Sequence, residues 1–158
     1  MRSRRGGEGG FTLMELVCVL ALLGIIALIA LPRLQPLLSQ MELRGEARRM
    51  AGIMRDCRSQ AVLDGTASEI IFHTGATPPM YRARAGGGDR VTYELAEGVN
   101  YVGITTFTRR VGGSPACAFF SNGRSDGGTV ALTDGSDIIY VIVYPSTARV
   151  RISRQPPS

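Results

Sequence analysis

A long run of apolar residues stands near the N-terminus of the chain. The sixteen residues from Leu16 to Leu31 carry no polar side chain. Residues 11–31 would rise about 31 Å as a helix, which is the thickness of a bilayer core. A cleaved secretory signal has a shorter apolar stretch that ends in small residues, whereas this run ends in LIALPRLQP. The pattern therefore predicts a retained membrane helix over 11–31.

Helical periodicity continues beyond Pro32 and Pro36, but the pattern becomes amphipathic. Apolar residues spaced by three or four positions form one stripe: Leu43, Ala47, Met50, Met54, Cys57 and Ala61. Charged residues lie off this stripe, with acids as ion-pair partners of arginines: Arg44, Arg48, Arg55 and Arg58, with Glu42, Glu46 and Asp56. The sequence LDGT at 63–66 supplies a helix stop. We expect a helical continuation over 32–64, with a helix break or bend at the two prolines, which remove backbone donors.

Short β-rich runs separated by turn residues follow from residue 65 to the end. The runs that fit strands are 68–74, 80–85, 90–95, 99–108, 116–120, 128–133, 137–144 and 148–153. The segment DGSD at 134–137 predicts a hairpin between the two runs that flank it. A β domain of this size needs the helical stripe to complete its core. The fold class predicted is α+β, a long N-terminal helix packed on a small antiparallel β domain over 65–158.

The charged residues near the apolar run predict its orientation in a membrane and single out one candidate functional residue. The chain has 18 arginines, no lysine and 13 acids, for a net charge of +5. Three arginines precede the apolar run (Arg2, Arg4 and Arg5), and the positive-inside rule keeps such residues cytoplasmic. The other arginines are scattered, which does not indicate a nucleic-acid footprint. Glu15 stands at the head of the apolar run, where a carboxylate in lipid costs roughly 2.5–3.5 kcal/mol, so it is a candidate functional residue.

The residues around Glu15 form a motif. A basic leader is followed in order by Gly10, Phe11, Thr12, Leu13, Glu15 and the apolar run. This arrangement resembles the class III signal of type IV pilins and pseudopilins. The resemblance implies that a prepilin peptidase removes residues 1–10 as a leader, cutting between Gly10 and Phe11, and methylates the new amine of Phe11. That amine, on the same chain or on a neighbour, would then pair with the Glu15 carboxylate and assist filament assembly, because opposite charges attract strongly in a low-dielectric medium. The alternative is an acid that rests among lipid headgroups.

A second region carries a related resemblance. The stretch 118–153, AFFSNGRSDGGTVALTDGSDIIYVIVYPSTARVRIS, is similar to the C-terminal part of the GspH/FimT family. That family implies a globular fold of two small antiparallel sheets packed on the helix, a pilin-like arrangement. Pro32 stands at the helix-breaking position of the family, and Pro36 is an additional breaker. Ala148 departs from the family, which often has glycine there, so the last turn is expected to differ in shape.

The resemblance implies a minor pseudopilin, a structural filament subunit of a type II protein secretion system. Its partners would be the prepilin peptidase, the major pseudopilin, the other minor pseudopilins and inner-membrane lipid. It would sit in the bacterial inner membrane as a single pass, with a cytoplasmic N-terminus and a periplasmic β domain, and would assemble into the periplasmic pseudopilus. The alternative is a FimT-like minor pilin of a type IV pilus that contacts DNA through Arg149, Arg151 and Arg154. A membrane-anchored enzyme is a third reading, against which the absence of a catalytic constellation counts.

Other polar residues have structural interpretations. His73 is expected to be a strand residue, and no acid–serine arrangement around it suggests catalysis. Asp126, Asp134 and Asp137 could bind calcium, but they also suit turns, so no metal is expected. No cofactor and no small-molecule substrate are expected either. Cys18 is most simply a small apolar residue in the membrane helix. Whether Cys57 and Cys117 form a disulfide after export stays open.

Overall fold

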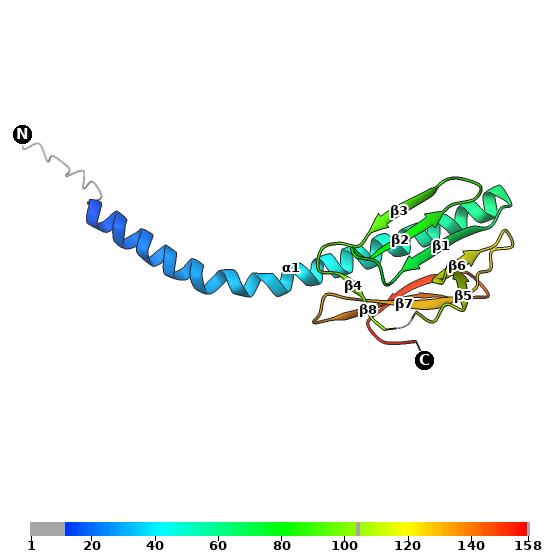
Figure 1. Ribbon diagram of the computed structural model, residues 1–158. Helices are drawn as coiled ribbons and strands as arrows, with labels where there is room; N and C mark the ends of the chain where they lie inside the picture. Colours follow the sequence, from blue (N-terminus) through cyan, green and yellow to red (C-terminus); the bar gives the residue numbers. More distant parts are fainter. Residues whose placement is uncertain (1–11, 104, 158) are drawn as a thin grey trace, which may run out of the picture. The chain divides into compact units, whose positions relative to one another are not determined.

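The computed structural model of the chain describes residues 12–103 and 105–157, with the backbone alone for residues 28–37. Contacts divide it into an N-terminal unit (residues 1–37) and a globular unit (residues 38–158). The elements assigned within the described residues (Figure 1) are α1 (Leu13–Asp64), β1 (Ser68–His73), β2 (Met80–Arg84), β3 (Arg90–Glu94), β4 (Asn100–Tyr101), β5 (Arg109–Val111), β6 (Ser114–Phe119), β7 (Gly128–Thr133), β8 (Ile138–Val143) and β9 (Val150–Ser153).

In the N-terminal unit, α1 begins at Leu13, and all of its described side chains, from residue 13 to residue 27, are exposed. Among the described residues, no helical stretch combines the length and the hydropathy that a bilayer crossing requires. The membrane helix over 11–31 stays a prediction. Phe11 lies outside the described residues, and so do the side chains of residues 28–31.

The helical backbone runs without interruption through Pro32 and Pro36. An internal proline removes one backbone donor and crowds the preceding turn, and a helix can absorb both effects by bending instead of ending. The predicted continuation over 32–64 is therefore present as part of α1. A break in the sense of an interrupted helix is not seen, and a bend at these positions stays a prediction.

The nine strands found among the described residues form two antiparallel sheets, as the sequence predicts. We call them sheet A, with the strand order β3-β2-β1-β6-β5, and sheet B, with the order β4-β7-β8-β9. The DGSD turn joins β7 to β8 in a hairpin with Thr133 opposite Ile138. The helix ends at Asp64, one residue before Gly65, whose φ of +66° favours glycine at this stop.

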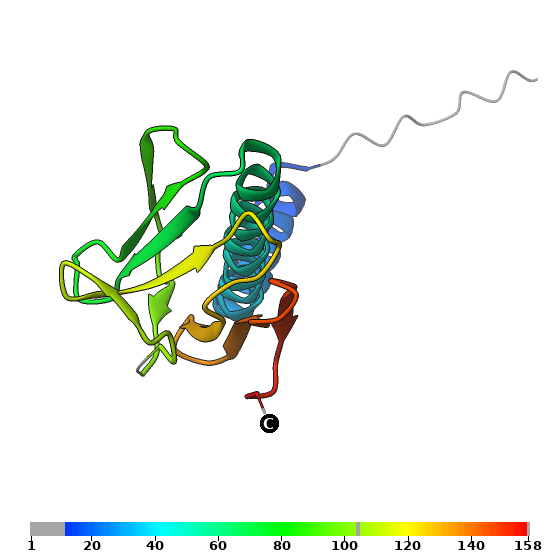
Figure 2. The same ribbon diagram turned by 90° about the vertical axis from the view of Figure 1, so that its right-hand side faces the viewer.

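The apolar stripe of α1 lies in the core of the globular unit. Its members are at most 1% exposed: Leu43, Ala47, Met50, Met54, Cys57 and Ala61. They belong to one cluster with residues of both sheets, such as Ile70 and Phe72 of β1 and Val130 of β7. Figure 2 looks along the helix and shows β1–β3 on one side of it and β8–β9 on another. The helix completes the core of both sheets, which explains its strict periodicity.

The strand predicted over 99–108 is wrong in its extent, because only Asn100 and Tyr101 form β4. Gly103, with a φ of +63°, interrupts the extended backbone. The chain still follows β7: Val102 N–H donates to the carbonyl of Ala131 (3.0 Å), and Thr106 N–H donates to that of Thr129 (3.0 Å).

This irregular segment is apolar for a different reason than strand packing. Phe107 is buried and stacks on Phe72 of β1, with ring centroids 5.0 Å apart. Phe107 also packs against the backbone of β7 at Gly128, where an added Cβ would lie 2.4 Å from its Cδ1 atom. The short strand β5, Arg109–Val111, follows it and was not predicted.

Candidate functional site

Thr12 forms the N-cap of α1, within the motif that the sequence singles out. Its Oγ1 accepts a hydrogen bond from the backbone N–H of Glu15 (3.2 Å), and its carbonyl accepts one from the N–H of Leu16 (3.1 Å). Glu15 is exposed. Gly10 and Phe11, the predicted cleavage and methylation positions, lie outside the described residues. The cut, the methylation and the charge pair between Phe11 and Glu15 therefore stay predictions.

The same geometry gives Glu15 a local role that the sequence analysis missed. Glu15 occupies the third position of the helix, so Thr12 and Glu15 have the T-x-x-E spacing of a capping box. In that motif the acid at the third position accepts from the backbone N–H of the capping residue. A carboxylate in the first turn also interacts favourably with the helix dipole, by roughly 0.3–1 kcal/mol at exposed positions. An acid here therefore favours the start of its own helix, besides any role toward a neighbour.

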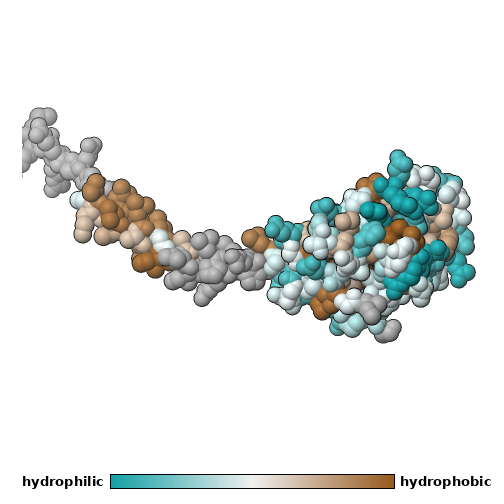
Figure 3. Space-filling view, viewed as in Figure 1, coloured by the Kyte–Doolittle hydropathy of each residue, from teal (hydrophilic) through white to brown (hydrophobic). Residues whose placement is uncertain are grey.

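The first half of α1 is apolar over much of the face that Figure 3 shows, and its exposed apolar residues occur at positions all round the helix. Its exposed large apolar residues are Leu13, Met14, Leu16, Val17, Val19, Leu20, Leu22, Leu23, Ile25 and Ile26. A helix that packs one face on a protein shows a stripe, whereas a helix that is apolar all round needs apolar surroundings on all sides. Lipid and the packed helices of other chains both supply such surroundings.

A buried polar cluster joins the second half of α1 to sheet A. Glu46 is 4% exposed, and Arg49 donates to its carboxylate through Nε (3.2 Å) and Nη2 (3.0 Å). The hydroxyl of the buried Tyr81, on β2, donates to the same carboxylate (3.4 Å), while Arg49 also donates to the carbonyl of Glu94 at the end of β3. Burial, and next the charge of Glu46, raise the pKa of Tyr81.

This cluster corrects one sequence-based expectation. Glu46 is not a surface partner of the arginines that lie off the stripe. It is held by Arg49, which the ion-pair pattern did not single out. Charged residues spaced by three or four positions on a helix form the same sequence pattern whether they face water or protein. The pattern therefore does not indicate that Glu46 is buried. The cluster fixes the position of the helix on the sheet through polar contacts as well as apolar ones.

The three arginines of the C-terminal segment are divided between two clefts. Arg149 and Arg151 line one with Tyr144, Ser146 and Thr147, and its volume is about 390 Å³. Arg154 lines another, together with Arg44 and Arg48 of α1. Along β9, the exposed Arg151 alternates with Val150, which is buried, as the strand pattern predicts. The arginines proposed for DNA contact in the alternative reading therefore do not gather in one place.

Ala148 keeps the conformation expected of a glycine. Its φ is +48°, and its methyl group is fully buried in the core. A left-handed conformation costs an L-residue roughly 1–2 kcal/mol. The buried methyl and the continuation of the core into β9 offset this strain. The backbone of this residue is left-handed although the side chain is alanine, and a difference of turn shape from the family stays a prediction.

His73 ends β1 and lies 3.3 Å, through Nδ1, from Oγ of Ser114 at the start of β6. The pair looks like a base and a nucleophile, a contact that residues 41 positions apart did not reveal in the sequence. In a serine–histidine–acid triad, the second ring nitrogen of the histidine is oriented by an acid. Within the described residues, Nε2 of His73 is buried without a hydrogen-bond partner. Burial, followed by the nearby Arg82, lowers the pKa of His73, so the ring is neutral near pH 7.

Two of the acids predicted to lie in turns accept hydrogen bonds from within the globular unit. Asp126 accepts from the backbone N–H of Ala118 (3.1 Å) and from Nε of Arg109. Asp134 accepts from the N–H groups of Ser136 and Asp137, both at 2.8 Å, and these bonds lower its pKa. No cluster of possible metal ligands occurs in the part of the chain that the structure describes.

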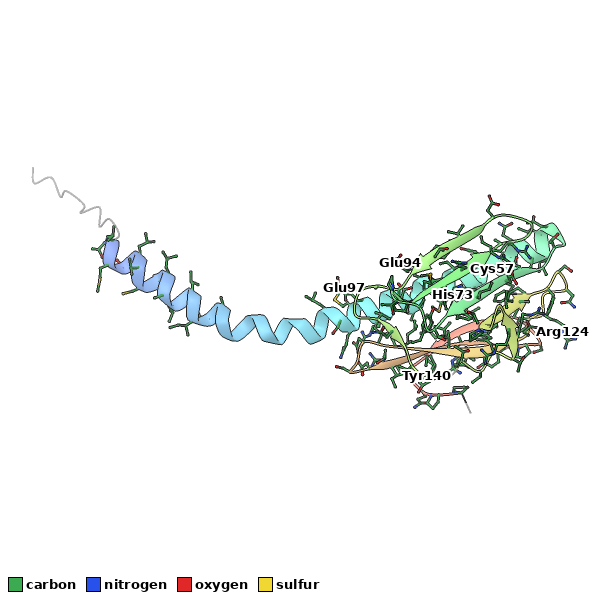
Figure 4. The ribbon with its side chains drawn as sticks, viewed as in Figure 1. Cys57, His73, Glu94, Glu97, Arg124 and Tyr140 are labelled. Carbon is green, nitrogen blue, oxygen red and sulfur yellow. The ribbon has the colours of Figure 1, made fainter. Side chains whose placement is uncertain are left out.

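The cysteines of the globular unit are free thiols in the structure. Burial raises the pKa of Cys57 to about 11 and that of Cys117 to about 12, so both stay protonated at neutral pH. Cys57 lies on α1 and His73 on β1 within the same unit (Figure 4).

Comparison with known proteins agrees with both regions of resemblance. The family described as the prokaryotic N-terminal methylation motif matches residues 5–31. The chain is 29% identical over 124 residues to the type II secretion system protein H of Xanthomonas campestris pv. campestris, across 78% of this chain and 70% of that protein. No solved structure matches significantly. The methylation motif lies at the head of α1, and the long helix on two antiparallel sheets agrees with the fold that the resemblance implies.

Proposed function

We propose that this chain is a minor pseudopilin, a structural filament subunit of a type II secretion system. A prepilin peptidase would cut it between Gly10 and Phe11 and methylate Phe11. The observation that carries the proposal is the match of the methylation motif to residues 5–31, at the start of a chain whose greater part is similar to a type II secretion system protein H. The helix that begins at Leu13 and exposes apolar side chains on all sides supports it.

The proposed location follows from the same segment. The arginines before residue 10 would stay in the cytoplasm, the apolar run to Leu31 would anchor the chain in the inner membrane, and the globular unit would lie in the periplasm. Assembly would then bring the apolar helix among those of other pseudopilins in the pseudopilus. We expect no enzymatic activity, because His73 and Ser114 lack an orienting acid among the described residues.

Processing is the direct test. In cells that contain a prepilin peptidase, the intact mass should show loss of residues 1–10 and one added methyl group. Gly10→Val should block this change, because a side chain next to the scissile bond would obstruct the approach of the peptidase. Gly9→Val is the matched control and should be processed. A wild-type chain that keeps its leader in such cells would overturn the proposal.

The role of Glu15 is tested by separating its charge from its hydrogen-bonding capacity. Glu15→Gln keeps an acceptor in the capping box, since glutamine also occurs at that position, but it cannot pair with the amine of Phe11. Glu15→Ala loses both properties. If the charge pair assists assembly, both variants should be depleted from filaments to a similar extent. If only capping matters, Glu15→Gln should enter filaments as the wild type does, and the charge pair would be refuted.

One observation bears on the alternative, a FimT-like pilin that contacts DNA. Arg149 and Arg151 are exposed and line the same cleft, although Arg154 does not. Residues 11–158 carry 15 arginines against 12 acids, a surplus too small and too scattered for a strong phosphate-binding surface. We expect the full chain in detergent to bind duplex DNA no tighter than the ~10⁻⁴–10⁻⁶ M range of non-specific binding at physiological salt. Tighter, salt-sensitive binding that Arg149→Ala with Arg151→Ala abolishes would favour the DNA-contacting pilin instead.

A further inference from the structure

A cationic groove lies between α1 and the C-terminal strand of sheet B. Its lining residues are Arg44, Arg48, Ile139, Ile152, Ser153 and Arg154, and its volume is about 390 Å³. We call it the β9 groove. The two helix arginines are one turn apart, and Arg154 comes from the residues just after β9. The groove is distinct from the cleft that Arg149 and Arg151 line.

The charges in the β9 groove are not balanced from within the protein. Its lining includes three guanidinium groups and no acid. None of the three forms an ion pair within the described residues, where the pairs found involve Arg49, Arg84, Arg90 and Arg109. The nearby acid Glu46 is already held by Arg49 and Tyr81. Like charges one helical turn apart repel each other, and a bound anion would remove this cost.

The walls of the β9 groove are held in place. Arg55, two turns after Arg48, donates from Nη2 to the carbonyl of Val150 (3.3 Å). This bond ties the helix to the outer edge of β9, which pairs only with β8 in sheet B. Ile139 is buried in the core, and Ile152 packs partly buried against it. The three arginines of the groove therefore belong to segments whose backbone positions folding fixes, and two isoleucines lie among them.

We infer that the β9 groove binds an acidic segment of another filament subunit, whose carboxylates pair with Arg44, Arg48 and Arg154. This inference rests on the proposed function, which supplies neighbouring subunits. Guanidinium groups bind carboxylates in bidentate pairs, and an aliphatic side chain between two acids fits against the two isoleucines. A phosphodiester backbone offers no such apolar group. A second copy of this chain is a poor occupant, because residues 11–158 carry a positive surplus.

Crosslinking in cells tests the inference with the full chain. A photoreactive amino acid replaces Ser153, which lines the groove, and the crosslinked products are identified by mass spectrometry. We expect a crosslink to a pilin-like protein through a peptide that contains aspartate or glutamate. Arg44→Glu with Arg48→Glu should reduce its yield about tenfold or more, the factor that ~1.4 kcal/mol of binding free energy represents.

A matched charge reversal separates the groove from the overall charge. Arg110→Glu with Arg124→Glu changes the net charge equally at two exposed positions outside the groove. Figure 4 places Arg124 at the end of the globular unit away from Glu97. The control pair should leave the crosslink intact. Both double variants should resist proteolysis as the wild type does, because none of the four arginines belongs to the core.

A binding titration completes the test. The crosslinked peptide, made synthetically, should bind the wild-type chain in detergent, more weakly as salt rises, and should bind the groove variant about tenfold more weakly. Crosslinks to lipid or nucleic acid alone, or a protein crosslink that the groove variant retains, would overturn the inference. The intact mass of the same cells keeps the two proposals apart. A processed chain without an acidic partner refutes only the groove, whereas an unprocessed chain refutes the pseudopilin.

Discussion

The two halves of α1 share one backbone but follow different rules of side-chain placement. From residue 13 to residue 27 every described side chain is exposed, and apolar residues occur on all sides. In the globular unit the same helix buries one stripe and exposes arginines elsewhere. The first half thus depends on surroundings that the chain does not supply, and the second half depends on its own sheets. Truncation of a leucine should therefore change the free energy of unfolding by different amounts in the two halves, and mutations can measure this difference.

A matched pair of leucine truncations should give the largest difference between the halves. Leu43 is 1% exposed and Leu20 is 59% exposed. Leu43→Ala should lower the free energy of unfolding of the globular unit by about 2–5 kcal/mol, because it leaves a cavity in the core. Leu20→Ala should change it by less than about 0.5 kcal/mol. Chemical denaturation of both variants in the same detergent measures the difference, and equal effects would mean that the first half also packs on the globular unit.

Two glycines provide the next comparison, between the helix surface and the sheet. At Gly128 the φ is +137°, and an added Cβ would meet the buried ring of Phe107. Gly128→Ala should therefore cost about 2–4 kcal/mol, through strain and overpacking. An added Cβ at Gly52 of α1 meets nothing within 4 Å, so Gly52→Ala should stabilise by about 0.5–1 kcal/mol. Thermal unfolding distinguishes the two signs, and a loss at Gly52 would contradict the view of an open helix face.

The buried acid sharpens the contrast within the globular half of α1. Glu46→Ala should cost about 1–3 kcal/mol, because it leaves the hydroxyl of the buried Tyr81 without its acceptor. Glu46→Gln keeps an acceptor and should cost less. Glu42→Ala, at an exposed position one turn earlier, is the control and should change little. Denaturation curves for the three variants would refute the cluster if Glu46 and Glu42 proved equivalent.

The smallest effect concerns pH. The described groups with shifted pKa values lie in the globular unit, and the pKa of His73 is lowered there by burial and by Arg82. The unfolded chain then binds a proton more readily than the folded one, so stability falls as pH drops below about 6.5 toward the folded pKa. The free energy of unfolding should be slightly lower at pH 5 than at pH 7. His73→Gln should reduce that difference, and an unchanged slope would assign it to other groups.

Periodicity predicted most of the globular unit, because the buried face of each element repeats at its own period. The helical stripe, the hairpin at DGSD and the two-sheet fold are confirmed. The prediction of one strand over 99–108 was wrong in its extent, because the buried Phe107 gives an irregular segment the apolar pattern of a strand. The prediction of Glu46 as a surface ion-pair partner was wrong, because a charge pattern on a helix does not indicate which charge is buried.

The candidate site could be predicted from the sequence only in part. The T-x-x-E spacing of Thr12 and Glu15 is present in the sequence, but the same acid also fits the prepilin motif, so the sequence alone does not indicate capping. The β9 groove could not be predicted from the sequence. Arg44 and Arg48 lie more than a hundred residues from Arg154, and only the fold brings them together. Contacts between distant segments leave no period in the sequence.

The order of the strands along the chain has a consequence for biosynthesis, because β9 follows the other described strands. Val150 and Ala148 belong to the core, and β9 covers the outer edge of β8. The globular unit therefore cannot close until β9 has been delivered to the compartment where it folds. Until then β8, with the sequence IIYVIV, has an unpaired apolar edge of the kind that joins other chains. A chain stalled before β9 would expose this edge, so prompt delivery of β9 is itself a safeguard against aggregation.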